Sequence, residues 1–250
     1  RIMRERFAAK KPRSWMLRFH TQTAGVSLTA QQPENNVVRT TVQALAAVLG
    51  GTQSLHVNSK DEALALPTEE AVQLSLRTQQ ILAHESGVTE TVDPLAGSYY
   101  VENLTDRIET AALEYISEID RLGGAVSALD HGYQMSEIHN SAFELQQRIE
   151  EGDRVVVGVN KFRTDDPPIE KLQGIDPNET TLQVDGVKKL RHQRDGEVTR
   201  STLERLGDIA RGSENTLPAI IECVEAYATV GEIADVFRNV FGEQREMGGI

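Results

Sequence analysis

Polar side chains stand at successive or alternating positions in two short segments whose other residues are typical of β-strands. They are Arg18, His20 and Gln22 in segment 15–22 (WMLRFHTQ), and Gln53, Ser54 and His56 in segment 52–57 (TQSLHV). Alternating residues of a strand share one face, so Arg18, His20 and Gln22 point the same way. Polar residues at the carboxyl ends of parallel barrel strands line active sites. The same residues on an exposed edge strand would only be solvated, and spacing alone leaves both interpretations open.

Other groups capable of chemistry give weaker patterns. His20 and His56 suggest a metal pair, but no third ligand stands at a metal-binding spacing, so we predict no protein-bound metal. Cys223 lies in an apolar stretch and is predicted to be a packed core residue rather than a nucleophile. The adjacent Asp61 and Glu62 suit an acid–base pair and the charged first turn of a short helix equally well.

The two polar segments flank a stretch with helical periodicity. Apolar residues repeat at helical spacing from Asn35 and Asn36, which can cap a helix, to the stop signal at 50–51. Strand, helix and strand joined by short loops predict a parallel, right-handed βαβ unit. Two parallel strands do not form a stable sheet alone, and parallel strands are normally buried on both faces. We therefore expect further strands from a partner chain or from the rest of a longer polypeptide.

After this unit the pattern is almost entirely helical. Basic residues in 1–14 predict a helix that ends at Pro12, and Thr105 with Asp106 can begin a helix that ends at 123–124. Turn-forming Asp and Pro residues predict a linker at 161–182. The remaining predicted elements are helices from Thr68 to Gly87, 136–150, 183–211, 216–228 and 230–241, and an extended segment at 154–160.

Composition limits the class of protein. The chain has 250 residues, a net charge of −12 and one cysteine. This acidity argues against nucleic acid or an anionic membrane as partner, because both attract basic surfaces. No apolar run approaches the ~20 residues that span a bilayer. We expect a cytoplasmic protein whose first residue is not its genetic start.

Several longer stretches resemble one enzyme family, the adenosylcobalamin-dependent acyl-CoA mutases, which include the methylmalonyl-CoA mutases. They are RFHTQTAGVSLTAQQPENNVVRT (18–40), ALAAVLGGTQSLHVNSKDEALALPTEEA (44–71), ESGVTETVDPLAGSYYVE (85–102) and VVVGVNKF (155–162). The similarity to the large, catalytic subunit runs from about residue 3 to residue 243. It implies an α/β fold made of the last two β/α units of a TIM (β/α)8 barrel followed by a helical C-terminal extension.

The resemblance also implies a division of the chain and a set of partners. Residues 1–104 would complete the acyl-CoA-binding barrel, 105–160 would be a helical extension with a short strand, 161–182 a linker, and 183–250 a C-terminal helical region. The family's cobalt-ligand motif DxHxxG is absent, since the nearest string, 130–132 (DHG), has the wrong spacing. Adenosylcobalamin would therefore be bound jointly with a separate cobalamin-binding domain or subunit, and another chain or segment would supply the other barrel strands.

Five residues are implied to bind the acyl-CoA substrate. Gln22, Gln53 and Ser54 resemble positions along the barrel channel that holds the pantetheine arm, and His20 would lie beside them. Arg13 stands where the family often has lysine, and we interpret it as the partner of a CoA phosphate. Unpaired polar groups are costly in a buried channel, so hydrogen-bonding side chains are expected there.

Four residues are implied to bind the cofactor. Asn58 and Glu62 resemble positions that hydrogen-bond the adenosyl ribose, while Gly25, Glu62 and Ala65 resemble positions against the corrin ring. A turn glycine and a helix alanine are the structural alternatives for Gly25 and Ala65.

The implied reaction is a radical carbon-skeleton rearrangement, from methylmalonyl-CoA to succinyl-CoA or between a related acyl-CoA pair. The family's catalytic histidine and acyl-recognition residues belong to barrel strands outside this sequence, so the acyl group is not specified. An alternative is a non-catalytic barrel half or assembly subunit that is active only when docked to partner chains. A third is a CoA-binding barrel enzyme without cobalamin.

Overall fold

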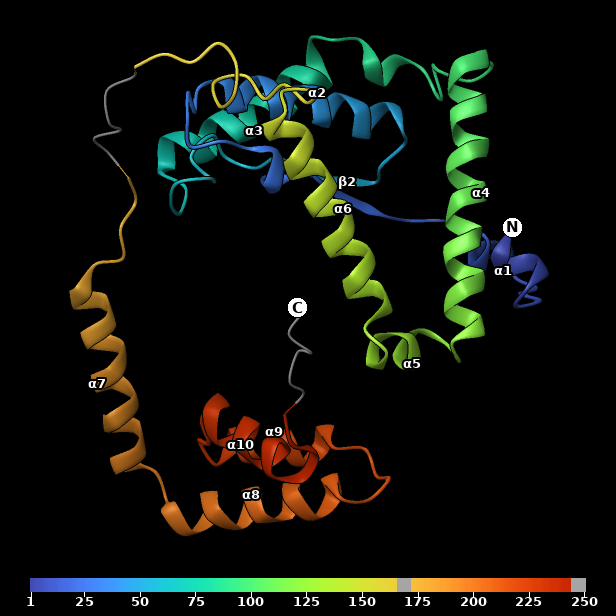
Figure 1. Cartoon of the computed structure of the whole chain (residues 1–250). Helices are drawn as coiled ribbons and strands as arrows, with labels where there is room; N and C mark the ends of the chain where they lie inside the picture. The colour runs from blue at the N-terminus through green and yellow to red at the C-terminus, as the bar shows by residue number, and fades with distance from the viewer. Residues whose placement is uncertain (166–171, 244–250) are drawn as a thin grey trace. The chain divides into compact units, whose positions relative to one another are not determined.

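A computed structural model describes residues 1–165 and 172–243 (Figure 1). The chain divides into two compact units, Arg1–Gly174 and Ile175–Ile250. Part of the predicted linker, 166–171, lies outside the described residues. The fold is a mostly helical α/β arrangement with a small parallel sheet, which is compatible with part of a barrel.

The sheet of the first unit consists of β1 (His20–Gln22) and β2 (Ser54–His56), which run parallel and are joined by α2 (Asn35–Leu49). His20 lies opposite Ser54, and Gln22 lies opposite His56. The predicted parallel βαβ unit is confirmed. Both strands are shorter than predicted, since only three residues of each are paired in a ladder.

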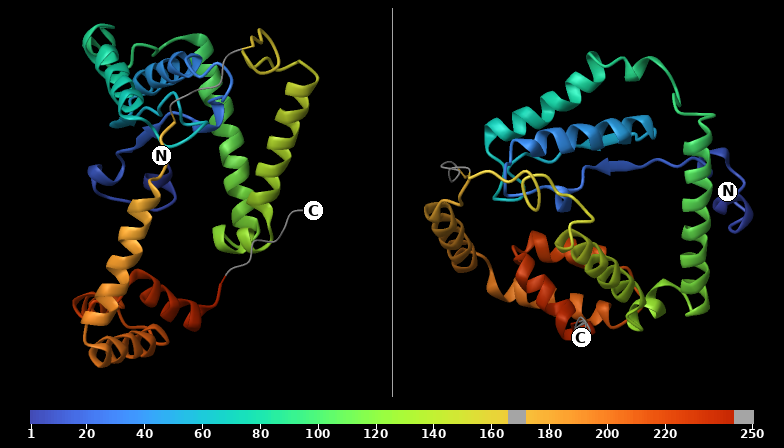
Figure 2. Two further views of the ribbon diagram at one scale, coloured as in Figure 1. Left: turned by 90° about the vertical axis from the view of Figure 1, so that its left-hand side faces the viewer. Right: turned by 45° about the horizontal axis from the view of Figure 1, so that its top comes forward.

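One face of this sheet is covered by α2 and by α3 (Glu69–His84), as the two views in Figure 2 show. The cap of α3 is as predicted, because Thr68 Oγ1 accepts a hydrogen bond from Ala71 N. The core beneath the helices contains Ala44, Val57 and Leu82, with Leu45 and Leu55 packed against them. The other face of the sheet is exposed, so the strands are covered on only one of the two faces on which parallel strands are normally buried.

The first unit begins and ends differently from the predictions. In place of one basic helix, it begins with the short α1 (Ile2–Glu5) and the 3₁₀ turn η1 (Pro12–Ser14). The helix α4 (Tyr99–Arg121) starts before Thr105 and Asp106, next to Ser98. Segment 154–160 forms no strand and contributes only a bridge between Val157 and Lys161. The other elements are η2 (Gly25–Ser27), η3 (Val88–Glu90), α5 (Ala125–Asp130) and α6 (Tyr133–Glu150).

The second unit is helical. Its elements are α7 (Pro177–Gln193), α8 (Gly196–Ala210), α9 (Leu217–Glu225) and α10 (Val230–Phe241). The predicted single helix 183–211 is two helices, because the Asp195 side chain accepts hydrogen bonds from Glu197 N and Val198 N and so starts a new helix. Cys223 lies fully buried with Leu206 and Ala219, which confirms its assignment to the core.

In the described part of the chain, no helix combines the length and apolar character that crossing a bilayer requires.

Candidate functional site

The loops that follow β1 and β2 meet at the carboxyl ends of the two strands. Thr23 N donates a hydrogen bond to His56 O (3.0 Å), and Asn58 N donates to Thr23 Oγ1 (2.9 Å). Thr23 and Asn58 are both buried. These bonds fix the start of each loop against the other, and in parallel α/β folds this edge of the sheet carries the ligand site.

Asn58 is a buried polar residue at this edge, with only 2% of its surface exposed. Its Oδ1 accepts a hydrogen bond from Gln22 Nε2 (3.0 Å), and its main-chain oxygen accepts one from Ser75 Oγ (3.3 Å). Its Nδ2 has no partner among the described residues. A buried donor without an acceptor costs free energy, and such atoms are found where a ligand or ordered water completes the bonding.

Gly25 and Glu62 complete the surroundings of this amide. A Cβ atom on Gly25 would lie 3.0 Å from Asn58 Nδ2 and 3.4 Å from Glu62 Oε1, so the two loops approach too closely for a side chain here. Glu62 is exposed, in contrast to Asn58. The structure thus places an amide donor and a carboxylate acceptor next to each other over a glycine, which is a pair that can bind hydroxyl groups.

The neighbouring carboxylate has a different role. Asp61 is buried, and its Oδ2 accepts hydrogen bonds from Thr68 N (3.0 Å) and Thr68 Oγ1 (3.2 Å). It therefore closes the loop before α3 and does not form an acid–base pair with Glu62. Ala65 lies in the same loop, where its N–H donates to Asp61 O, and not in a helix.

The exposed face of the sheet carries a row of polar side chains that leads to Asn58. His20 Nδ1 and Ser54 Oγ lie 2.7 Å apart and share a hydrogen bond. Gln22 is the next residue on the same face of β1, about 7 Å further along the strand. The row therefore runs from the His20–Ser54 pair through Gln22 to the amide of Asn58.

Two predicted substrate residues lie apart from this row. Gln53 Oε1 accepts from Phe19 N (2.8 Å) and Gln53 Nε2 donates to Gly51 O (2.8 Å), so its amide is occupied at the amino ends of the strands. Arg13 is exposed in η1, and no contact within the described residues joins it to the other candidate side chains. The geometry brings together Gly25, Asn58, Glu62 and Gln22, and pairs His20 with Ser54.

Sequence reasoning missed the buried residues that hold the two loops, of which Asn36 is the clearest. It was predicted to cap α2, but the cap position is Glu34 and no side chain caps the helix. Asn36, Thr40 and Ala44 are the buried residues of α2 and stand four positions apart on one stripe. A polar residue on the buried stripe of a helix was the available signal, since a buried amide must find partners.

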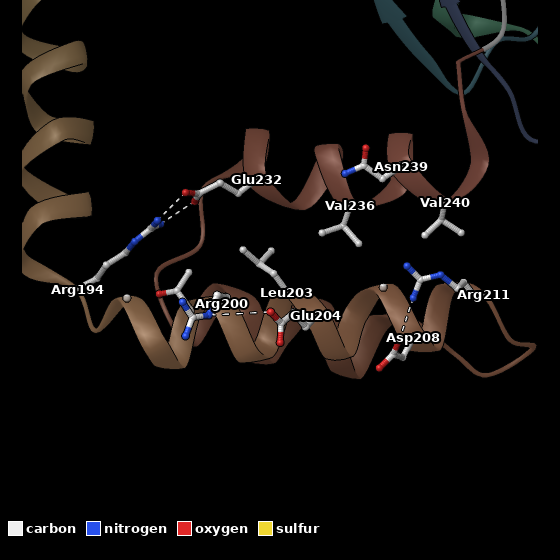
Figure 3. A pocket seen from close by; sticks show the side chains of 13 residues that line it. Arg194, Arg200, Leu203, Glu204, Asp208, Arg211, Glu232, Val236, Asn239 and Val240 are labelled. Atoms are coloured by element: carbon white, nitrogen blue, oxygen red, sulfur yellow. Dashed lines mark hydrogen bonds and ion pairs between the residues drawn. The ribbon is translucent and has the colours of Figure 1, made fainter.

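A pocket with a volume of about 660 Å³ lies elsewhere, between α8 and α10 of the second unit. Figure 3 shows Leu203 and Val236 pointing into it, and the guanidinium of Arg194 bound to the carboxylate of Glu232 at its edge. The two hydrogen bonds of this pair are 2.5 and 2.6 Å long, and they hold the pKa of Glu232 down at about 2. None of the predicted site residues lines this cavity.

Comparison with known proteins places the chain in a family. A sequence profile described as "Methylmalonyl-CoA mutase" matches residues 1–243, so the chain belongs to the methylmalonyl-CoA mutase family. The sequence resemblance to this family is thereby confirmed.

Three relatives show the extent of the match. The chain is 47% identical over 97% of its length to the methylmalonyl-CoA mutase of Rhizobium meliloti (strain 1021). It is 42% identical over 98% to the 2-hydroxyisobutanoyl-CoA mutase large subunit of Aquincola tertiaricarbonis, and 43% identical over 94% to the methylmalonyl-CoA mutase of Escherichia coli (strain K12). It spans 34%, 44% and 33%, respectively, of the lengths of these relatives.

Proposed function

We propose that this chain is the part of the catalytic subunit of a coenzyme B12-dependent acyl-CoA mutase that supplies the last two β/α units of its TIM barrel. Membership of the family supports this proposal, as does a parallel βαβ unit with polar groups along one face and at its carboxyl ends. The observation that carries it is the Nδ2 of Asn58, which lies beside Gly25 and Glu62 and has no partner in the described part of the chain.

The residues present fit an adenosyl group. The buried amide of Asn58 offers a donor, the exposed carboxylate of Glu62 offers an acceptor, and Gly25 lets both approach its backbone where a side chain would crowd them. A ribose carries adjacent hydroxyls that both donate and accept, and a hydrogen bond to a carboxylate is the stronger kind. In this proposal Asn58 and Glu62 hold the ribose, while Gly25 and Ala65 allow close approach of the corrin ring. The chemistry that adenosylcobalamin supplies when bound is homolysis of its cobalt–carbon bond to give a carbon radical.

The same proposal assigns the exposed strand face to the acyl-CoA substrate. Gln22 and the His20–Ser54 pair form a hydrogen-bonding row along the strands, which suits the amides and carbonyls of an extended pantetheine arm. Gln53 would act at the amino end of this row, and Arg13 would pair with a CoA phosphate. The polar row leads to the proposed adenosyl site, so substrate and cofactor would meet at the carboxyl ends of β1 and β2.

The proposed reaction is a radical rearrangement of an acyl-CoA carbon skeleton, of which methylmalonyl-CoA to succinyl-CoA is one example. Two relatives are named for methylmalonyl-CoA and one for 2-hydroxyisobutanoyl-CoA, so the proposed substrate class is acyl-CoA. The partners in this proposal are the segment or chain that supplies the other barrel strands and a cobalamin-binding domain or subunit. The other barrel strands would pair along the edges of the two-stranded sheet, and its exposed face would then line the barrel interior.

The second candidate is a non-catalytic barrel half that serves assembly. The exposed polar face favours it, because the described residues leave this face of the sheet uncovered. The two candidate functions predict different results when the complete enzyme is tested. If the chain binds the cofactor, then adding adenosylcobalamin changes the visible absorption, adding acyl-CoA produces a radical signal in electron paramagnetic resonance, and Glu62→Ala weakens both. Signals that Glu62→Ala leaves unchanged would favour the assembly role, and the absence of both signals would contradict mutase function.

A further inference from the structure

We propose that Asn36 is a positioning residue that sets the spacing of the two loops of the adenosyl site. This inference rests on the proposed function, because it concerns the residues that would bind the adenosyl group. The loops are 23–29, which contains Gly25, and 57–62, which contains Asn58 and Glu62. Asn36 itself lies in the first turn of α2, and its side chain forms hydrogen bonds with Thr29, Arg39 and Lys60.

The side chain of Asn36 bridges the two loops and has no exposed surface. Its Nδ2 donates one hydrogen bond to Thr29 O (2.9 Å) and another to Lys60 O (2.8 Å). Its Oδ1 accepts from Thr29 N (3.1 Å) and from Arg39 Nη1 (2.7 Å). An asparagine amide has two donor hydrogens and two acceptor lone pairs, so all four are used.

The bridge acts directly on the spacing of the site. Lys60 lies between Asn58 and Glu62, and Thr29 follows Gly25 by one turn, which is closed by a hydrogen bond from Leu28 N to Gly25 O (3.0 Å). Both main-chain groups that Asn36 Nδ2 binds therefore belong to the loops that meet over Gly25. Because a Cβ on Gly25 would come within 3.0 Å of Asn58 Nδ2, the loops have little room to move closer.

Arg39 extends the bridge to a third segment. Its Nη1 also donates to Thr29 Oγ1 (3.0 Å), and its Nη2 donates to Val157 O (2.8 Å). Gln32 Nε2 donates to the main-chain oxygen of Phe162 (2.9 Å), which follows Val157 closely in the sequence. Segment 154–164 is thus fastened to the loop after β1, and it holds the guanidinium group that orients Asn36.

Thr40 offers a matched comparison, since it lies one turn further along the same buried stripe and is 2% exposed. Its Oγ1 donates only within its own helix, to Asn36 O (3.0 Å) and Val37 O (3.1 Å). A variant at Thr40 therefore measures the cost of altering a buried polar residue of α2 without breaking the bridge between the loops.

The test uses the complete enzyme that contains this chain and two cobalamins. One is adenosylcobalamin and the other is methylcobalamin, which carries a methyl group in place of the adenosyl group. Asn36→Asp keeps the shape and the acceptor Oδ1 but places an oxygen against the carbonyls of Thr29 and Lys60. We expect the affinity for adenosylcobalamin to fall about tenfold, equivalent to about 1.4 kcal/mol, while the affinity for methylcobalamin is unchanged. Thr40→Val should leave both affinities unchanged and lower only the melting temperature.

A milder variant keeps the test decisive if Asn36→Asp does not fold. Arg39→Lys removes the hydrogen bond to Asn36 Oδ1 from a half-buried position, and we expect a loss of about threefold for adenosylcobalamin alone. Equal losses for both cobalamins, or no loss in either variant, would overturn the inference. If the parent enzyme does not bind adenosylcobalamin, or if Glu62→Ala leaves its affinity unchanged, the proposed function fails instead and the positioning role falls with it.

Discussion

Gln22 Nε2 donates a hydrogen bond to Asn58 Oδ1 across the carboxyl ends of the two strands, at a distance of 3.0 Å. Because the carbonyl end of the Asn58 amide is engaged in this way, its Nδ2 is turned toward Gly25 and Glu62 and stays without a partner among the described residues. One exposed strand residue thus orients the buried donor on which the proposed cofactor site depends.

Gly25→Ala is expected to damage the site without damaging the fold. The added methyl group would lie 3.0 Å from Asn58 Nδ2, so the amide must shift. The affinity for adenosylcobalamin in the complete enzyme should fall about tenfold, which corresponds to about 1.4 kcal/mol of binding free energy. The control is Gly174→Ala, where a Cβ meets nothing within 4 Å. Spectrophotometric titration checks both variants, and equal affinities would count against a close approach at Gly25.

Glu62→Gln should separate binding from stability. Glu62 is exposed, so its loss should change the free energy of unfolding by no more than about 0.5 kcal/mol. Turnover of the acyl-CoA should nevertheless fall at least about tenfold, because a charged acceptor for the ribose is replaced by a neutral one. Glu69→Gln, which changes an exposed carboxylate in the first turn of α3, should leave turnover unchanged. Steady-state rates and thermal melts of both variants provide the measurement.

The stability of the second unit should depend on pH through Glu232. Its pKa is lowered from 4.5 to about 2, first by the hydrogen bond from Arg194 and then by bonds from Thr229. A carboxylate with a lowered folded-state pKa stabilises the fold fully above its ordinary pKa, and this contribution is lost as the pH falls from 4.5 toward 2. Thermal unfolding of the chain by circular dichroism should show that loss.

Glu232→Gln should remove this pH dependence. At pH 6 the variant should be less stable by about 2 kcal/mol, because a charge-assisted double hydrogen bond with Arg194 is lost. The difference from the parent should shrink as the pH falls below 4.5. Glu214→Gln serves as the control, because Glu214 is an exposed carboxylate in the loop before α9. The stability of this variant should match that of the parent at every pH. If the difference in stability between Glu232→Gln and the parent stays constant from pH 6 to pH 2, the role assigned to the Arg194–Glu232 pair is refuted.

Cys223 should be unreactive in the folded protein. It lies fully buried in the core of the second unit, and burial raises the pKa of its thiol. A thiol reagent such as dithionitrobenzoate should modify it only at the rate at which the unit unfolds, and quickly in denaturant. Fast modification under native conditions would contradict its place in the core.

The sequence was sufficient to predict the parts of the fold that depend on local patterns. The parallel unit, the cap at Thr68 and the buried Cys223 follow from strand alternation, capping preference and apolar clustering. The break at Asp195 was not predicted, although aspartate is a good capping residue, because the apolar periodicity continues on both sides of it.

The candidate site was only partly predictable. Polar residues on the strands indicated where it lies, but the hydrogen bonds from Phe19 N to Gln53 and from Gln22 to Asn58 join segments that meet only in three dimensions. The bridge made by Asn36 includes a bond to Lys60, which lies 24 positions away in the sequence, so no local pattern specifies it.

The most direct test of the cofactor site is the affinity of Asn58→Asp for adenosylcobalamin in the complete enzyme. This change keeps the acceptor that Gln22 binds and replaces only the unpartnered Nδ2 with an oxygen. We predict an affinity at least about tenfold below that of the parent, which corresponds to about 1.4 kcal/mol of binding free energy. The affinity for methylcobalamin should be unchanged. Equal affinity of parent and variant for adenosylcobalamin would contradict the assignment of Asn58 to the adenosyl ribose.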